Sequence, residues 1–280
     1  MTDRGTDADT KPDNVSRNIL QSELDFSKVL FKEHPKCYWI WKYRLWVLDQ
    51  VTDKLRIDVA RAIWNEELAF ISKILVKDRR NFHAWAFRRH IVTKLESAAL
   101  LGHSMIESEY DFTTRMIRQD LSNFSAWHNR TQLIPRLLRE RKSGDEARRK
   151  FLEAELELVR GAINVGPDDQ SPWYYHKFLM YNLTDGSSIN QVVFSHLPKT
   201  DRKSYLLQEI SNVQELTDDF ADVKWIWEAL VEQSLAIFHL DGRPGSIQER
   251  ADLNLWFQRL EVLDQKRLGR WNYLKNNLGL

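Results

Sequence analysis

Residues 34–48, HPKCYWIWKYRLWVL, place three tryptophans among lysine and arginine side chains, a combination that can serve different chemical purposes. Trp39, Trp41 and Trp46 could stack on nucleic-acid bases, because single-strand binding proteins pair aromatic side chains with cations. The same rings could instead form a core, or belong to one copy of a repeat. The whole chain carries 41 lysines and arginines against 40 aspartates and glutamates, so its net charge of +1 gives no bias towards nucleic acid or an anionic membrane.

The residue types that bind metals or act as nucleophiles are dispersed along the chain. Cys37 is the single cysteine, so no internal disulfide can form, and no Cys/His spacing around it is typical of zinc. The segment GRPGS (242–246) lacks the Lys-Ser/Thr ending of a phosphate-binding loop. We expect no metal or cofactor on this chain, and we interpret the eight histidines as surface or packed residues: His34, His83, His90, His103, His128, His176, His196 and His239.

The length and composition suit one large domain or two small ones. The 280 residues are 42% hydrophobic, enough for a substantial core. No apolar run reaches the roughly 18 residues of a membrane span. Residues 1–17 are polar and lack the apolar region of a secretory signal, so we predict a disordered N-terminal tail there and a cytoplasmic location.

The tryptophan-rich stretch has relatives within the chain. CYWIWKYR (37–44), NFHAWAFR (81–88), NFSAWHNR (123–130) and QSPWYYHK (170–177) align, and VKWIWEALV (223–231) is a looser fifth copy. Each of the first four follows an amphipathic segment that begins with glutamate, and each glutamate precedes its aligned tryptophan by 18 residues. The pairs are Glu23–Trp41, Glu67–Trp85, Glu109–Trp127 and Glu155–Trp173. A fixed internal distance with variable spacing between copies predicts a rigid two-element module.

Both elements of the module are predicted to be helices. Apolar residues in the first element, such as those of ELAFISKILVK (67–77), follow the 3.6-residue period. Asn81, Asn123 and Asp169 stand where helix N-caps belong, and Pro35 and Pro167 fall in the turns. The sequence therefore predicts an all-α fold, a right-handed α-α superhelix (solenoid) of helical hairpins.

We expect a single domain over residues 18–280. Its repeats run over about 23–50, 67–95, 109–138, 153–183 and 205–240, and a closing helix covers 247–277. The aligned tryptophans are predicted to be buried between neighbouring hairpins. Two roles stay open for the arginine three residues after each tryptophan (Arg44, Arg88, Arg130): it binds a neighbouring carboxylate or carbonyl, or it joins a row of exposed cations.

The module resembles the repeat of protein prenyltransferase α subunits over about residues 20–235. NFSAWHNRTQLIPRLL (123–138) and DDQSPWYYHK (168–177) are most similar to the Rab geranylgeranyltransferase (type II) members. LDQKRLGRWNYL (263–274) resembles their closing helix, and the absence of a leucine-rich extension resembles the shorter fungal form. The α subunit shared by farnesyltransferase and geranylgeranyltransferase type I is an alternative, and a catalytically silent helical scaffold is another.

The resemblance implies an αβ enzyme that is inactive as the α subunit alone. In such an enzyme the β subunit holds the zinc and the isoprenoid pocket, and a Rab escort protein presents Rab GTPase substrates. By the same resemblance, Lys36 of the Pro35-Lys36-Cys37-Tyr38 turn reaches the β-subunit pocket near the diphosphate, with Tyr38 beside it. His83 contacts substrate or diphosphate, or is a plain interface residue. The implied subunit contacts are Asn81, Phe82, Arg88, Asn123 and Arg130.

The N-terminal end departs from the family pattern. Members usually carry a further hairpin with its own Trp-x-x-Arg-Arg before the unit with the lysine turn, whereas about twenty polar residues precede that unit here. We therefore expect the helix over 23–33 to expose its apolar face, which would weaken docking to a β subunit.

Overall fold

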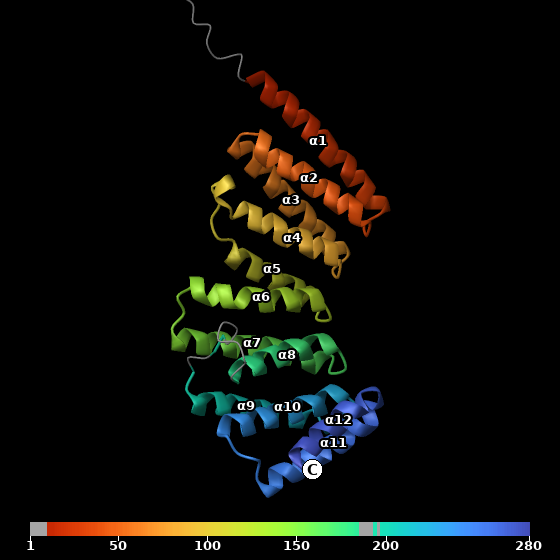
Figure 1. Cartoon of the computed structure of the whole chain (residues 1–280), viewed down its shortest axis with the longest axis vertical. Coiled ribbons are helices and arrows are strands. Elements are labelled where there is room, and N and C mark those ends of the chain that lie inside the picture. The colour runs from red at the N-terminus through yellow and green to blue at the C-terminus, as the bar shows by residue number, and fades with distance from the viewer. Residues whose placement is uncertain (1–9, 185–192, 195–196) are drawn as a thin grey trace, which may run out of the picture. The chain divides into compact units, whose positions relative to one another are not determined.

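The computed structural model describes residues 10–184, 193–194 and 197–280, and over these ranges the chain forms twelve α-helices, two short 3-10 helices and no strands (Figure 1). Its contacts divide the chain into two compact units, Met1–Asp111 and Phe112–Leu280. The predicted all-α fold of repeated helical hairpins is confirmed. The expected single domain over 18–280 stays a prediction, because the hairpins of a repeat protein contact only their neighbours and can group in this way.

Unit 1 contains two hairpins and the start of a third. Hairpin 1 is α1 (Thr10–Glu33) and α2 (Tyr38–Lys54), and hairpin 2 is α3 (Ile57–Lys77) and α4 (Phe82–Leu95). A 3-10 helix (Ala98–Leu100) leads to α5 (Ile106–Gln119), which continues into unit 2. The core of unit 1 is formed by buried side chains from all four hairpin helices, including Leu24, Leu48, Trp64 and Ile91.

Unit 2 completes hairpin 3 and adds two more. Hairpin 3 is α5 and α6 (Phe124–Glu140), hairpin 4 is α7 (Asp145–Val165) and α8 (Gln170–Leu183), and hairpin 5 is α9 (Lys199–Glu215) and α10 (Lys224–Asp241). The chain ends with α11 (Ile247–Leu263), a 3-10 helix (Gln265–Arg267) and α12 (Leu268–Leu278). Its core includes Trp127, Leu179, Phe257 and Trp271.

The aligned tryptophan of each hairpin forms a hydrogen bond with the turn between the two helices. In all five hairpins its indole N–H donates to the carbonyl oxygen of the residue six positions earlier, in the turn between the two helices. The distances are 3.0 Å for Trp41, 2.9 Å for Trp85, 2.8 Å for Trp127, 2.7 Å for Trp173 and 2.9 Å for Trp227. The five rings are buried, so the predicted core role of the four closely aligned tryptophans is confirmed. The turn carbonyl satisfies a buried N–H that would otherwise be costly.

The helix boundaries predicted at the two ends of the repeat array differ from those in the structure. Helix α1 begins at Thr10, so residues 10–17, expected to lie in a disordered tail, are helical, while residues 1–9 lie outside the described ranges. The closing helix predicted over 247–277 is two helices. The break occurs at Asp264, whose backbone leaves the helical region and whose buried carboxylate binds Lys224 Nζ at 3.0 Å and Arg267 Nε at 2.5 Å.

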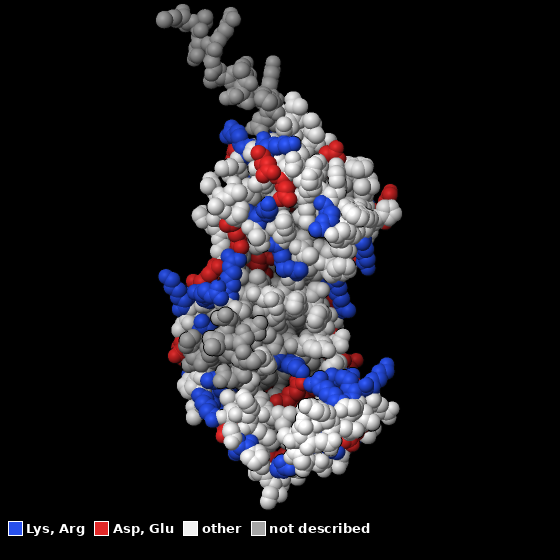
Figure 2. All heavy atoms as spheres, viewed as in Figure 1, with Lys and Arg blue, Asp and Glu red and all other residues white. Residues whose placement is uncertain are grey.

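The first helix exposes apolar side chains, as the sequence predicted. Phe26 and Val29 are 56% and 54% exposed, and Ile19 and Val15 continue the exposed set along the same helix. On the face drawn in Figure 2, cationic and anionic side chains are mixed within each unit. Within the described ranges no helix is long and apolar enough to cross a membrane.

Candidate functional site

The turn of hairpin 1 presents an unpaired cation. Helix α1 ends at Glu33 and α2 begins at Tyr38, and the turn between them is held by Trp41 Nε1, 3.0 Å from the oxygen of Pro35. Lys36 is exposed in this turn, and no hydrogen-bond or ion-pair partner for its ammonium lies within the part of the chain that the structure describes. The charge of Lys36 is therefore available to a group outside this chain.

Aromatic rings line the N-terminal ends of α2 and α4 next to this turn. Tyr38 is 50% exposed, Trp39 is 76% exposed and Phe82 is 68% exposed. The half-buried His83 ring lies 4.0 Å from that of Phe82 and 6.3 Å from that of Tyr38, measured between centroids. We call Lys36, Tyr38, Trp39, Phe82 and His83 the turn edge of unit 1. The structure thus brings Tyr38 and His83, predicted from different repeats, within reach of one partner.

The asparagines predicted at the subunit interface are buried caps. Asn81 accepts a hydrogen bond from the Ala84 N–H at 3.1 Å, and Asn123 accepts one from Ala126 at 3.1 Å. Their side chains therefore begin α4 and α6, as the N-cap prediction stated, and each cap contributes roughly 1 kcal/mol. Asn81 is 3% exposed and Asn123 is fully buried, so both side chains serve as caps within this chain. Their contact with another subunit stays a prediction.

The repeated arginines form buried ion pairs with the leading glutamate of the following hairpin. Arg44 pairs with Glu67, Arg88 with Glu109 and Arg130 with Glu155, each through two parallel hydrogen bonds. The guanidinium also donates to hydroxyls on the first helix of its own hairpin: Ser27 for Arg44, Ser72 for Arg88, and Thr113 and Thr114 for Arg130.

This arrangement decides between the two roles left open for the arginines. Arg88 and Arg130 are 4% and 2% exposed, so they bind neighbouring carboxylates and do not form a row of surface cations. Their role in subunit contact stays a prediction, and these side chains expose little surface for it. The planar guanidinium matches a carboxylate at two points, which explains why arginine recurs at this position.

The fourth copy replaces the arginine with histidine. His176 Nε2 lies 3.0 Å from Glu209 Oε2, and Arg160 binds the other carboxylate oxygen. Burial raises the pKa of the Glu209 carboxyl, but the hydrogen bonds from His176 and Arg160 outweigh burial and hold that pKa below its usual range. The link between hairpins 4 and 5 is therefore a titratable one.

A cavity that the sequence analysis missed lies in unit 2 between α8, α10 and α12. Its volume is about 440 Å³, and Met180, Leu235, Ala236 and Leu274 line much of its wall. Gln233 is 2% exposed at this cavity, and neither polar atom of its side chain has a partner among the described residues. An apolar hollow with an unsatisfied buried amide is typical of a binding surface.

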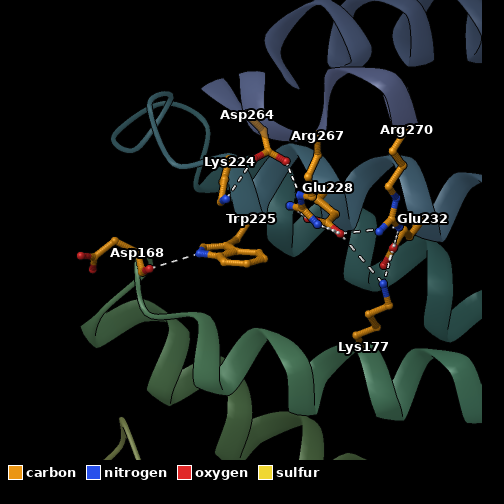
Figure 3. Close-up of polar contacts among 9 residues, drawn as sticks. All are labelled: Asp168, Lys177, Lys224, Trp225, Glu228, Glu232, Asp264, Arg267 and Arg270. Atoms are coloured by element: carbon orange, nitrogen blue, oxygen red, sulfur yellow. Dashed lines mark hydrogen bonds and ion pairs between the residues drawn. The ribbon is translucent and has the colours of Figure 1, made fainter. Parts of the chain in front are cut away.

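Charged residues from three helices border this cavity: Lys177, Glu232 and Arg270. Figure 3 shows the polar contacts among them. Lys177 of α8 binds Glu232 of α10, and Arg270 of α12 lies 2.9 Å from the same carboxylate. Glu228, which does not line the cavity, lies 3.7 Å from Arg270 and binds Arg267 at 2.5 Å. These residues are up to 93 positions apart, from Lys177 to Arg270, and no short motif joins them. Lys177 is the only one of these residues whose position the repeat could have predicted, because it stands four residues after the aligned Trp173.

No group of three or more His, Cys, Asp or Glu side chains that could hold a metal ion occurs within the described ranges. Cys37, the single cysteine, is half-buried in the turn of hairpin 1. The described side chains thus supply one free cation, an imidazole and exposed aromatic rings at the turn edge.

Comparison with known proteins identifies the repeat. Residues 20–51, 64–95, 106–137 and 152–183 match the family model described as the protein prenyltransferase alpha subunit repeat. These stretches coincide with hairpins 1 to 4. The chain belongs to the protein prenyltransferase α-subunit family.

Within this family, the chain is similar to curated proteins that share one name. The chain is 33% identical over 185 residues to a protein of Saccharomyces cerevisiae named geranylgeranyl transferase type-2 subunit alpha, covering 66% of this chain and 54% of the relative. Proteins of the same name are 31% identical in Schizosaccharomyces pombe (77% and 62% covered) and 37% identical in Dictyostelium discoideum (78% and 60% covered). The chain thus spans between about half and two thirds of the length of these relatives.

A solved structure supports the fold. A chain of the Candida albicans protein geranylgeranyltransferase-I complexed with GGPP superposes with a TM-score of 0.60 over 95% of this chain and 76% of the other, at 19% identity. At this identity the likeness concerns the fold alone.

Proposed function

We propose that this chain is the α subunit of a heterodimeric Rab geranylgeranyltransferase, which transfers geranylgeranyl from geranylgeranyl diphosphate to C-terminal cysteines of Rab proteins. The observation that carries the proposal is its similarity to type-2 α subunits at 31–37% identity. In this proposal a zinc-containing β subunit binds the isoprenoid, the complex works in the cytoplasm, and this chain alone is inactive. The zinc would activate the cysteine thiolate on the partner.

The turn edge of unit 1 is the proposed contribution to catalysis. In prenyl transfer the cysteine sulfur bonds to the allylic carbon while the carbon–oxygen bond to diphosphate breaks, so negative charge accumulates on the leaving oxygen. An unpaired ammonium such as that of Lys36 stabilises this charge most strongly inside a site closed from water. Tyr38 is proposed to orient the leaving group beside it, and His83 to contact substrate or diphosphate. Phe82 and Trp39 are proposed to be covered by the β subunit, since 68% and 76% of their surface is exposed in this chain alone.

The cavity between α8, α10 and α12 is the proposed docking surface for the Rab escort protein. The β subunit is assigned to the turn edge, so a second protein partner needs another surface. The cavity offers apolar walls, the unsatisfied amide of Gln233 and a charged border. Such a combination fits an apolar anchor side chain surrounded by polar contacts.

A catalytically silent scaffold is the second candidate, and the exposed face of α1 favours it. With Phe26 and Val29 more than half exposed, hairpin 1 has an uncovered side that could weaken docking of a β subunit. The two candidates differ in one property: an α subunit binds a prenyltransferase β subunit, and a silent scaffold does not.

Co-expression with a type II β subunit tests the proposal. Size-exclusion chromatography, a zinc assay and Rab prenylation in the presence of escort protein would be measured on the same sample. We expect a 1:1 zinc-containing complex that prenylates Rab. A chain that is folded by circular dichroism yet elutes alone would favour the silent scaffold.

A further inference from the structure

A small cavity in unit 2 is built almost wholly of aromatic rings. It has a volume of about 230 Å³ between α6 and α8, and we call it the aromatic socket. Its floor is formed by the buried rings of Trp127 and Tyr175, whose centroids are 4.7 Å apart. Phe124 and Tyr174, both 47% exposed, form its rim and meet edge to face at 6.0 Å. Phe178 and Ser171 complete the wall.

The polar groups of the floor and wall are already occupied. Trp127 Nε1 donates to the oxygen of Leu121 at 2.8 Å, and the Tyr175 hydroxyl donates to Glu155. The hydroxyl of Ser171 donates to the oxygen of Ser122 at 3.2 Å, and that of Thr131 to the oxygen of His128 at 2.7 Å. The floor and wall of the socket therefore offer ring surface, while the polar groups of His128 and Tyr174 belong to its exposed rim. An apolar occupant fits this floor and wall.

Comparison with unit 1 explains why the socket is open. There the His83 ring stacks on Trp41, with centroids 5.9 Å apart and planes 17° from parallel. His83 stands two residues before Trp85, and Ser171 stands two residues before Trp173, so the two occupy the same repeat position. A small serine at this position leaves the space over Trp127 unfilled.

The size of the socket points to a single side chain. Sites for small molecules and cofactors usually measure roughly 300–1,000 Å³, more than this cavity provides. Interfaces between proteins, in contrast, are commonly anchored by one large apolar side chain in a well-packed pocket.

We infer that the aromatic socket receives one apolar side chain, such as Phe, Leu or Met, from the β subunit. The inference rests on the proposed function, in which Tyr38 and Phe82 lie at the subunit interface. Phe124 holds the same repeat position, three residues before the aligned tryptophan, so the turn of hairpin 3 presents its ring in the register proposed for hairpins 1 and 2. Exposed aromatic surface of this kind is normally covered by a partner.

Two substitutions test the socket in opposite ways. Ser171→His places an imidazole over Trp127, as His83 of hairpin 2 covers Trp41, and so fills the socket. Phe124→Ala removes an aromatic ring from its rim. With β subunit immobilised on a biosensor, we expect each variant to raise the dissociation constant at least about tenfold. Leu207→Ala, on a side chain 49% exposed on α9 and outside the socket, is the matched control and should bind like the wild type. Far-UV circular dichroism and thermal unfolding verify that each variant is folded.

The outcomes separate this inference from the proposed function. If the wild-type chain binds no β subunit, the proposed function fails. If the wild type binds and both socket variants bind equally well, the socket is not part of the interface and the inference is overturned. An interaction at the socket that weakens steeply with added salt, in the wild type but not in Phe124→Ala, would identify a cation there and overturn the apolar assignment.

Discussion

Arg130 of hairpin 3 holds Glu155 of hairpin 4 through two parallel hydrogen bonds of 2.6 Å, with both side chains almost completely buried. The pair joins α6 to α7, and Thr113 and Thr114 tie the same guanidinium to α5. One side chain thus connects three helices. The ion pair is a structural joint between repeats, and it recurs as Arg44–Glu67 and Arg88–Glu109.

Removing this arginine should destabilise the chain strongly. Arg130→Ala leaves Glu155 charged and buried, and we expect a loss of about 3–5 kcal/mol in the free energy of unfolding. Arg130→Lys should lose less, because the charge remains but the two-point contact does not. Urea unfolding followed by circular dichroism measures both. Lys150→Ala breaks an exposed ion pair with Glu146 and should change the free energy of unfolding by no more than about 1 kcal/mol. If Arg130→Ala changes that free energy by no more than Lys150→Ala does, the Arg130–Glu155 pair is not a structural joint.

The contact of Glu209 with His176 and Arg160, which joins hairpin 4 to hairpin 5, should weaken in acid. The pKa of Glu209 is lower in the folded chain than its usual 4.5. The joint's contribution to stability is therefore complete above that pH and is lost as the pH falls through the folded-state value. Urea midpoints measured between pH 7 and pH 3 should fall less steeply below pH 5 in Glu209→Gln than in the wild type. Parallel curves would show that Glu209 does not carry this dependence.

Much of the local structure could be predicted from single repeats. The caps Asn81 and Asn123 were identified because asparagine before an apolar helical pattern has one common use. The buried role of Trp41, Trp85, Trp127 and Trp173 followed from their recurrence. Both inferences depend on residues within one hairpin, where sequence spacing fixes position.

Relationships between hairpins were harder to predict. Arg88 and Glu109 were both recognised as recurring residues, yet their pairing across 21 positions was not, because periodicity gives a helix face and no distance. The sequence consequently left two roles open for the arginines, a bond to a neighbouring carboxylate or carbonyl and a row of exposed cations. The cavity of Gln233 was missed for the same reason, since α8, α10 and α12 contribute to it from separate parts of the chain.

The exposed face of α1 offers a matched comparison. Phe26 and Phe70 each stand three residues after the leading glutamate of a hairpin, but Phe70 faces the guanidinium of Arg44 at 4.9 Å whereas Phe26 is 56% exposed. Phe70→Ala should therefore cost about 1–3 kcal/mol, and Phe26→Ala should stay within about 0.5 kcal/mol. Chemical denaturation measures both. A large loss from Phe26→Ala would mean that α1 is covered in the native protein.

Filling the cavity between α8, α10 and α12 should separate the two proposed partners. Ala236→Trp places a large ring in the cavity, so we expect it to leave β-subunit binding intact and to weaken escort-protein binding at least about tenfold. Both affinities can be measured by isothermal titration calorimetry. Ala251→Trp, on an exposed alanine of α11, is the control. Unchanged escort binding in Ala236→Trp would remove the cavity from the proposal.

The turn lysine carries the sharpest prediction about catalysis. Lys36 is exposed and unpaired within the described chain, so Lys36→Ala should leave the stability of this chain unchanged. In the reconstituted αβ complex the same variant should lower the turnover number by ~10²-fold, since losing one charge-stabilising donor has an effect of this size. Lys36→Arg keeps the charge and should retain more activity, while Lys54→Ala, at the exposed end of the same hairpin, should have no effect. Single-turnover kinetics would show the loss in the chemical step. If Lys36→Ala turns over like the wild type, the diphosphate leaves without help from this lysine, and the turn serves the subunit interface alone.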